Sequence, residues 1–164
     1  MRALAHLRVY RFEPGAVFEG ALVGAVERMK LGGEAKLLDA LFVAHDASSG
    51  ALAAVDLASG GADGTFASML DFRLDTGRRR AITERTLAEH HGGIPRSLIE
   101  EIAATLEAGA AIFAVLHKGS APTALEDAVA RCHGRLIADH PVDAGALAQI
   151  GPQLPAAVVA ATPR

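Results

Sequence analysis

The sequence predicts an α+β fold, a ferredoxin-like split β-α-β sandwich with an additional helix and strand at its C-terminal end. Two observations lead to this prediction. Short apolar segments typical of strands alternate with amphipathic helical segments, and glycines, prolines and capping patterns separate them. We expect residues 1–142 to form a single α+β domain with an irregular insertion at residues 60–93, followed by a short helix and tail at residues 143–164. The 164 residues, 51% of them hydrophobic, suit one ordinary domain and exclude a disordered chain.

The first part of the chain contains four expected elements. Residues 4–12 alternate polar and apolar side chains, as in a strand with one apolar face. Residues 36–45 and 51–58 are predicted to be the two strands of a hairpin, which is the firmest pairing in the sequence. Residues 16–29 repeat apolar side chains at helical spacing, and one stripe of this helix carries small residues that let it lie close to a sheet: Ala16, Gly20 and Gly24.

Residues 60–93 differ from the rest of the chain because no clean hydrophobic period emerges there. A short helix or a hairpin within a long loop is compatible with this composition. Long loops inside compact domains are usually functional or mobile, so we expect this segment to contact a partner or a neighbouring subunit.

The second half alternates helices and strands regularly. A capping-box pattern and a terminal glycine predict a helix over residues 95–108, and the apolar run that follows predicts a buried strand at 110–117. A second capping box at Thr123 begins another helix, and residues 135–141 form the last strand of the domain. Several sheet positions on the face away from the helices are Ala, Val or Leu, which favours self-association through that face or through the sheet edges.

Two stretches resemble a known family. The first is KLLDALFVAHD, residues 36–46, with the turn and strand that follow it. The second is IPRSLIEEIAATLEAGAAIFAV, which begins at Ile94, followed by AVARCHGRLIADH at residues 128–140. They resemble bacterial proteins described as membrane proteins of uncharacterised function, and in particular their soluble actinobacterial relatives. Many members carry a glycine-rich hydrophobic segment between the two halves, whereas Gly60 to Gly93 is too polar to span a bilayer. The resemblance implies no established reaction and no catalytic residues.

The most distinctive local feature is a group of five arginines within residues 72–85, where the only acidic residues are Asp75 and Glu84. Guanidinium groups bind phosphate or carboxylate in bidentate fashion, so such a group can hold an anion or an acidic partner. The alternative is a solvated loop, or arginines paired with acidic residues across a subunit interface. The candidate residues are Arg73, Arg78, Arg79, Arg80 and Arg85.

The histidines form a second group of candidates. Imidazole is a common metal ligand, and the candidates here are His117, His140 and His133. His117 and His140 stand at the ends of two strands expected to be neighbours, where they could meet. Their spacing matches no known ligand pattern, and Cys132 is expected to be a core thiol, so neither a metal nor another cofactor is predicted.

Asp39 interrupts an apolar strand. A buried carboxylate is costly unless it is paired. We expect an edge position, a subunit contact or a partner such as Arg8 or Arg11 on an adjacent strand.

The charge and hydropathy patterns exclude two further classes. A net charge of −3 argues against general nucleic-acid binding. The longest uncharged stretch, residues 144–163, is interrupted by prolines, so no transmembrane span is expected. The single free cysteine is compatible with a reducing compartment, and a cytoplasmic location is predicted.

Three functional hypotheses follow. The first is a non-catalytic, homo-oligomeric interaction or regulatory module that binds an acidic or anionic partner at the arginines. The second is a small-ligand- or metal-binding enzyme with a cavity formed on the sheet face. The third is peripheral binding to anionic lipids through Arg78 to Arg80.

Overall fold

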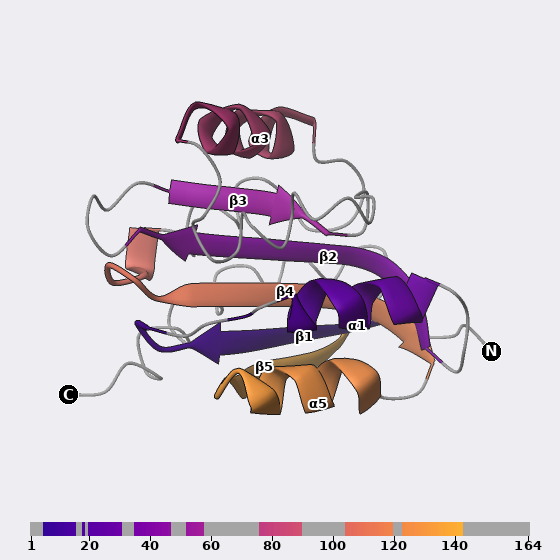
Figure 1. Ribbon diagram of the computed structural model, residues 1–164. Helices are drawn as coiled ribbons and strands as arrows, with labels where there is room; N and C mark the ends of the chain where they lie inside the picture. Colours follow the sequence, from indigo (N-terminus) through magenta and orange to yellow (C-terminus); the bar gives the residue numbers. More distant parts are fainter. Residues whose placement is uncertain are drawn as a thin grey trace.

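The computed structural model describes residues 5–15, 18, 20–30, 35–46, 52–57, 76–89, 104–119 and 123–142. They form an α+β fold with a five-stranded antiparallel sheet, as the sequence predicts at this level (Figure 1). The elements are β1 (Ala5–Phe12), α1 (Ala21–Lys30), β2 (Ala35–His45), β3 (Leu52–Asp56), α3 (Thr76–Glu89), β4 (Ala111–Gly119), α5 (Thr123–Arg131) and β5 (Arg135–Val142).

The strand order is β3-β2-β4-β1-β5. Strand β4 therefore lies between β1 and β2, and β1 lies between β4 and β5, so the units β1-α1-β2 and β4-α5-β5 interlock. The pairing of β2 with β3 confirms the expected hairpin strands, with Phe42 opposite Val55. Strand β5 pairs directly with β1, so the last predicted strand is an integral part of the sheet.

Helices α1 and α5 lie side by side on one face of the sheet (Figure 1). Leu22 and Val26 of α1 and Leu125 of α5 are buried there among the inward-facing residues of the strands. Three aromatic rings form the centre of this layer: Phe18 stands edge-on to Phe12 and Phe42, with ring centroids 4.9 and 5.2 Å apart. Edge-to-face rings at this distance add to the stabilisation that burial provides.

The opposite face of the sheet is also buried. Leu7, Val9, Leu41 and Ile112 project to that side, and none of them is more than 2% exposed. Leu106, from the segment before β4, belongs to the same cluster. The self-association expected through an apolar sheet face would need these side chains, and burial within one chain leaves them no surface to offer a partner.

Helix α3 is the main difference from the expected irregular insertion. It runs along the outer edge of β3 (Figure 1), where the Thr83 Oγ1 accepts a hydrogen bond from the Ala54 backbone N–H at 3.1 Å. The same hydroxyl donates to the Arg79 carbonyl at 2.8 Å. Among the described side chains, the packed side of this helix consists of Thr83, Thr86 and Arg79 with the partly buried Ile82, so a single apolar residue lies where a hydrophobic period would need several.

Several expected elements lie wholly or largely outside the described residues. They are the connection at 47–50, most of the helix expected at 95–108, and the helix and tail at 143–164. Within the described part of the chain, no helix has both the length and the apolar character needed to cross a bilayer.

Candidate functional site

Helix α3 carries four of the five candidate arginines, and these four differ in their exposure to solvent. Arg78, Arg80 and Arg85 are exposed, whereas Arg79 is only 8% exposed. The Arg79 Nη2 lies 3.9 Å from the Asp46 Oδ2, so this arginine helps to attach α3 to the end of β2. Arg73 lies outside the described residues.

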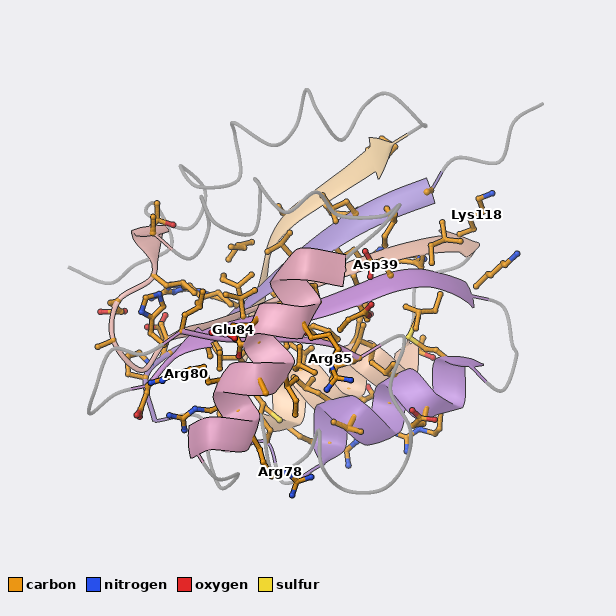
Figure 2. The ribbon with its side chains drawn as sticks, turned by 90° about the horizontal axis from the view of Figure 1, so that it is seen from above. Asp39, Arg78, Arg80, Glu84, Arg85 and Lys118 are labelled. Atoms are coloured by element: carbon orange, nitrogen blue, oxygen red, sulfur yellow. The ribbon has the colours of Figure 1, made fainter. Side chains whose placement is uncertain are left out.

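The three exposed guanidinium groups flank the packed side of the helix. Figure 2 shows Arg78 and Arg85 on one side of α3 and Arg80 with Glu84 on the other. Arg78 and Arg85 are seven residues apart, which is two helical turns and therefore one side. Among the described side chains of α3, the exposed ones thus include three cations and the carboxylate of Glu84.

The histidine candidates do not come together. His117 on β4 is opposite His6 on β1, and His140 on β5 is opposite Leu7, so β1 separates the two predicted neighbours. His133 is exposed and has a φ of 60° at the end of α5, where it ends the helix in a left-handed conformation. In the described residues no three potential ligands are close enough to hold a metal ion.

A different group of polar residues meets at the end of the sheet near the start of α5. In this polar cluster the Arg8 Nη1 lies 2.7 Å from the Glu126 Oε1, and the Arg8 Nη2 lies 3.3 Å from the Asp139 Oδ2. The His6 Nδ1 lies 3.8 Å from the Asp139 Oδ1, and the His6 ring stacks on His117 with centroids 5.6 Å apart. These residues come from three strands and a helix, so sequence spacing gives no sign of them.

The floor of the polar cluster is buried. His117 is 1% exposed, and neither of its ring nitrogens has a hydrogen-bond partner of standard geometry among the residues that the structure describes. Burial lowers the pKa of His117, and the electrostatic effects of the Arg8 guanidinium and of the neighbouring His6 lower it further. Burial also raises the pKa of Tyr10, with Arg8 partly offsetting that change. The cluster therefore favours a neutral imidazole beside an arginine whose charge two carboxylates balance.

Asp39 is buried at 4% exposed, and its Oδ1 accepts a hydrogen bond from the Ala40 N–H at 2.9 Å. It follows a register shift between β2 and β4, next to Leu37. The expected partners Arg8 and Arg11 are on β1, which β4 separates from β2. Asp39 is therefore not next to either arginine, and it pairs with β4 in the part of β2 that precedes the residues paired with β3.

Arg11 is fully buried on the other face of the sheet. Its Nη2 lies 2.6 Å from the Glu107 Oε1 and its Nε lies 3.3 Å from the Glu13 Oε1. These contacts tie β1 to the segment before β4, which is a structural role. Arg8 and Arg11 are both paired with carboxylates inside the fold, whereas the arginines of α3 other than Arg79 are exposed. The exposed arginines of α3 are therefore the candidate binding surface.

No protein-family model, no curated protein and no solved structure matches this chain. The resemblance to bacterial membrane proteins of uncharacterised function remains a prediction from the quoted motifs.

Proposed function

We propose that the protein is a non-catalytic, homo-oligomeric interaction module that binds an acidic protein segment through α3. The observation that supports the proposal best is the display of Arg78, Arg80 and Arg85 on a helix where, among the described side chains, Glu84 carries the exposed carboxylate. Arginine forms bidentate, charge-assisted hydrogen bonds with carboxylates, and these are stronger than neutral hydrogen bonds.

The attachment of α3 to the sheet supports binding in a second way. The Thr83 hydroxyl is bonded to the edge of β3, and Arg79 is paired with Asp46. A helix fixed in this way presents its arginines in a set arrangement before a partner arrives. Binding then costs less conformational entropy than it would on a flexible loop.

An acidic protein fits this surface better than a lipid bilayer does. Helices that lie in a membrane interface bury an apolar face among the lipids. The packed side of α3 holds Thr83, Thr86 and Arg79 against the sheet, and the exposed side shows cations beside Glu84. The described part of α3 therefore has no apolar face to offer a membrane.

An oligo-glutamate peptide labelled with a fluorophore tests the α3 proposal by anisotropy. The Arg80→Ala/Arg85→Ala variant should bind about 3- to 30-fold more weakly than wild type, as expected from the loss of two exposed ion pairs. A Lys36→Ala/Lys118→Ala variant removes the same charge from two exposed strand positions and should bind like wild type. Equal weakening by both pairs would contradict the proposal, and so would binding of wild type only to vesicles containing anionic lipid.

We propose that self-association uses the β5 edge. β5 is the last strand in the sheet order and pairs with β1 on one side. On this strand the large apolar side chain of Leu136 is 45% exposed. A second copy of the chain can extend the sheet by pairing with this edge, and Leu136 would then be covered.

Size-exclusion chromatography with light scattering tests the edge proposal. Wild type should form a dimer or a larger assembly, and Leu136→Lys should shift it to a monomer. Leu38→Lys alters another large apolar side chain that is exposed, on β2, and should leave the assembly intact. A wild type that is strictly monomeric at high concentration would contradict self-association.

We also propose a ferredoxin-like assignment built from β1, α1, β2, β4, α5 and β5, whose strands follow the order β2-β4-β1-β5. In this assignment the additional elements are β3 and α3, and not the C-terminal helix and strand. A cytoplasmic location agrees with the buried free thiol of Cys132, which a reducing compartment would keep unmodified.

A further inference from the structure

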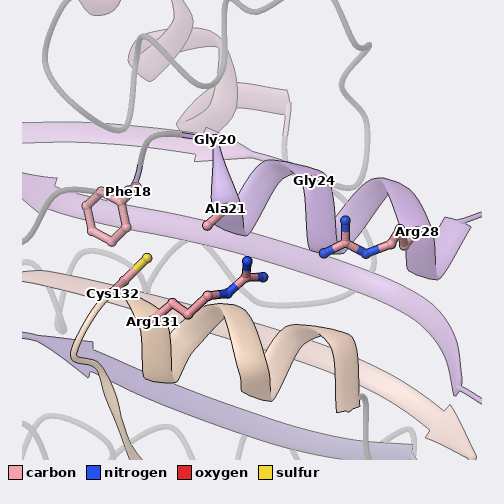
Figure 3. Close-up of a pocket in the computed structure, with 7 residues that line it drawn as sticks. All are labelled: Phe18, Gly20, Ala21, Gly24, Arg28, Arg131 and Cys132. Carbon is pink, nitrogen blue, oxygen red and sulfur yellow. The ribbon is translucent and has the colours of Figure 1, made fainter.

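A pocket of about 330 Å³ lies between α1 and α5. Figure 3 shows the Arg131 guanidinium of α5 in the space between the two helices, and Arg28 lying along α1 with its guanidinium turned back toward Gly24. Its remaining lining residues are small or apolar: Phe18, Gly20, Ala21, Gly24 and Cys132. The volume is at the lower end of the range for small-molecule sites.

The charges of Arg28 and Arg131 are available to bind a ligand. In the described part of the chain, neither Arg28 nor Arg131 makes an ion pair, whereas Arg8, Arg11 and Arg79 all do. Two cations that face one pocket repel each other, so the arrangement is stabilised by an anion between them. A phosphate dianion matches this pair in charge and in its capacity for bidentate hydrogen bonds.

Gly24 keeps the pocket open. Glycine is a poorer helix former than alanine, and a tight packing contact is the usual reason for placing it inside a helix. A Cβ at Gly24 would meet only the Arg28 Nη1, at 3.7 Å, which is ordinary contact. The sequence pattern predicted close approach to the sheet, but the structure places Gly24 at the pocket, where a methyl group would occupy space beside the guanidinium.

The apolar residues that line the pocket favour a ligand with an organic part over an inorganic ion. Phe18 and Cys132 are buried at its inner end, and Ala21 adds a methyl group. α1 also begins here at Ala21, so the positive end of its dipole adds to the attraction for an anion. We infer that the pocket binds a small phosphate monoester, with Arg28 and Arg131 holding the phosphate and the organic part against Phe18 and Ala21.

Isothermal titration with phenyl phosphate and with inorganic phosphate tests this inference. Phenyl phosphate should bind wild type more tightly than inorganic phosphate. Arg28→Gln and Arg131→Gln should each weaken phenyl phosphate binding about tenfold or more, because each removes a charge-assisted contact. Lys118→Gln removes one exposed charge outside the pocket and should bind like wild type.

Gly24→Ala provides an independent variant because it fills the pocket without removing charge. It should weaken phenyl phosphate binding while the helix stays folded, as judged by circular dichroism. The inference is overturned if wild type shows no binding up to about 10 mM ligand, a weak affinity even for a small molecule. It is also overturned if neither arginine variant differs from Lys118→Gln, or if inorganic phosphate binds as tightly as phenyl phosphate.

Discussion

Helices α1 and α3 are attached to the same sheet by different forces. α1 buries Leu22 and Val26 against one face of the sheet, in a layer with three edge-to-face aromatic rings. α3 lies at the edge of β3 and is attached by the Thr83 hydroxyl and by the pair between Arg79 and Asp46. The first attachment is non-directional and grows with buried area, whereas the second depends on a few polar atoms.

This difference explains what each helix exposes. A helix that uses apolar side chains for packing shows an ordinary polar surface to solvent. α3 uses threonines and one arginine for packing, and three further arginines remain on its outer surface. The edge of an open sheet tends to pair with other chains, and a covering helix prevents that on β3. One segment therefore protects the sheet and displays the candidate binding surface.

The largest expected effect is in the apolar layer. Leu22→Ala should lower the free energy of unfolding by about 2–5 kcal/mol, because Leu22 is fully buried and the cavity cannot collapse completely. Val23→Ala, on the less buried side of α1, should cost clearly less. Urea denaturation measures both, and equal costs would show that α1 is not held by its apolar face.

The polar attachment of α3 predicts a smaller effect. Thr83→Val keeps the shape of the side chain and removes the acceptor of the Ala54 N–H, which should cost about 1–3 kcal/mol. Thr86→Val is the matched control, because the Thr86 hydroxyl donates only to the Ile82 carbonyl within the helix, at 2.8 Å. It should change stability by less than about 0.5 kcal/mol. Hydrogen exchange at the Ala54 amide should speed up in Thr83→Val alone, and unchanged exchange there would refute the edge attachment.

The polar cluster beside α5 makes the free energy of unfolding depend on pH. Because the folded state lowers the pKa of His117, the unfolded chain binds a proton more readily below about pH 6.5, the ordinary histidine pKa. Stability present above that pH should therefore be lost as the pH falls towards the folded pKa. The groups that face His117 are His6, Arg8 and Asp139, with Glu126 beyond Arg8.

His117→Leu should remove part of this acid sensitivity, measured as the thermal midpoint at about pH 5.5 relative to about pH 7.5, one unit either side of the ordinary histidine pKa. The control is His133→Asn, which replaces an exposed histidine outside the cluster. Asparagine adopts the positive φ of this position readily. It should keep the pH dependence of wild type. An identical pH profile for His117→Leu and wild type would show that His117 does not contribute.

The smallest expected effect is a gain. Gly24→Ala should stabilise the protein by about 0.5–1 kcal/mol, since alanine is the better helix former and its methyl group meets only the Arg28 guanidinium. Thermal unfolding without added phosphate measures this gain. A loss of stability would indicate that Gly24 is needed for packing, as the sequence pattern predicted.

The strand and helix positions could be predicted wherever apolar side chains do the packing. Residues 36–45 and 51–58 were predicted as a hairpin, and β2 and β3 pair with Val43 opposite Ala54. For residues 60–93 the sequence left a short helix and a hairpin open and did not locate α3, because its buried contacts are made mainly by hydroxyls and a guanidinium, which give no clear hydrophobic period. Its arginines are evident from composition alone, but composition does not predict that Arg79 is buried and Arg80 is exposed.

The order of the strands limited the prediction of sites. His117 and His140 could meet if their strands were neighbours, but β1 lies between these strands, and His117 instead faces His6. The polar cluster and the pocket between Arg28 and Arg131 depend on contacts between residues about a hundred positions apart. Local spacing contains no information on such contacts, whereas the strand order fixes them.

The most direct test of α3 as the binding surface is an NMR titration of the labelled protein with an oligo-glutamate peptide. The account predicts amide shift changes concentrated at residues 76–89 and on the neighbouring strand β3. These changes should be lost in Arg80→Ala/Arg85→Ala and retained in Lys36→Ala/Lys118→Ala. Shift changes that fall elsewhere on the sheet, or that persist in the arginine variant, would contradict it.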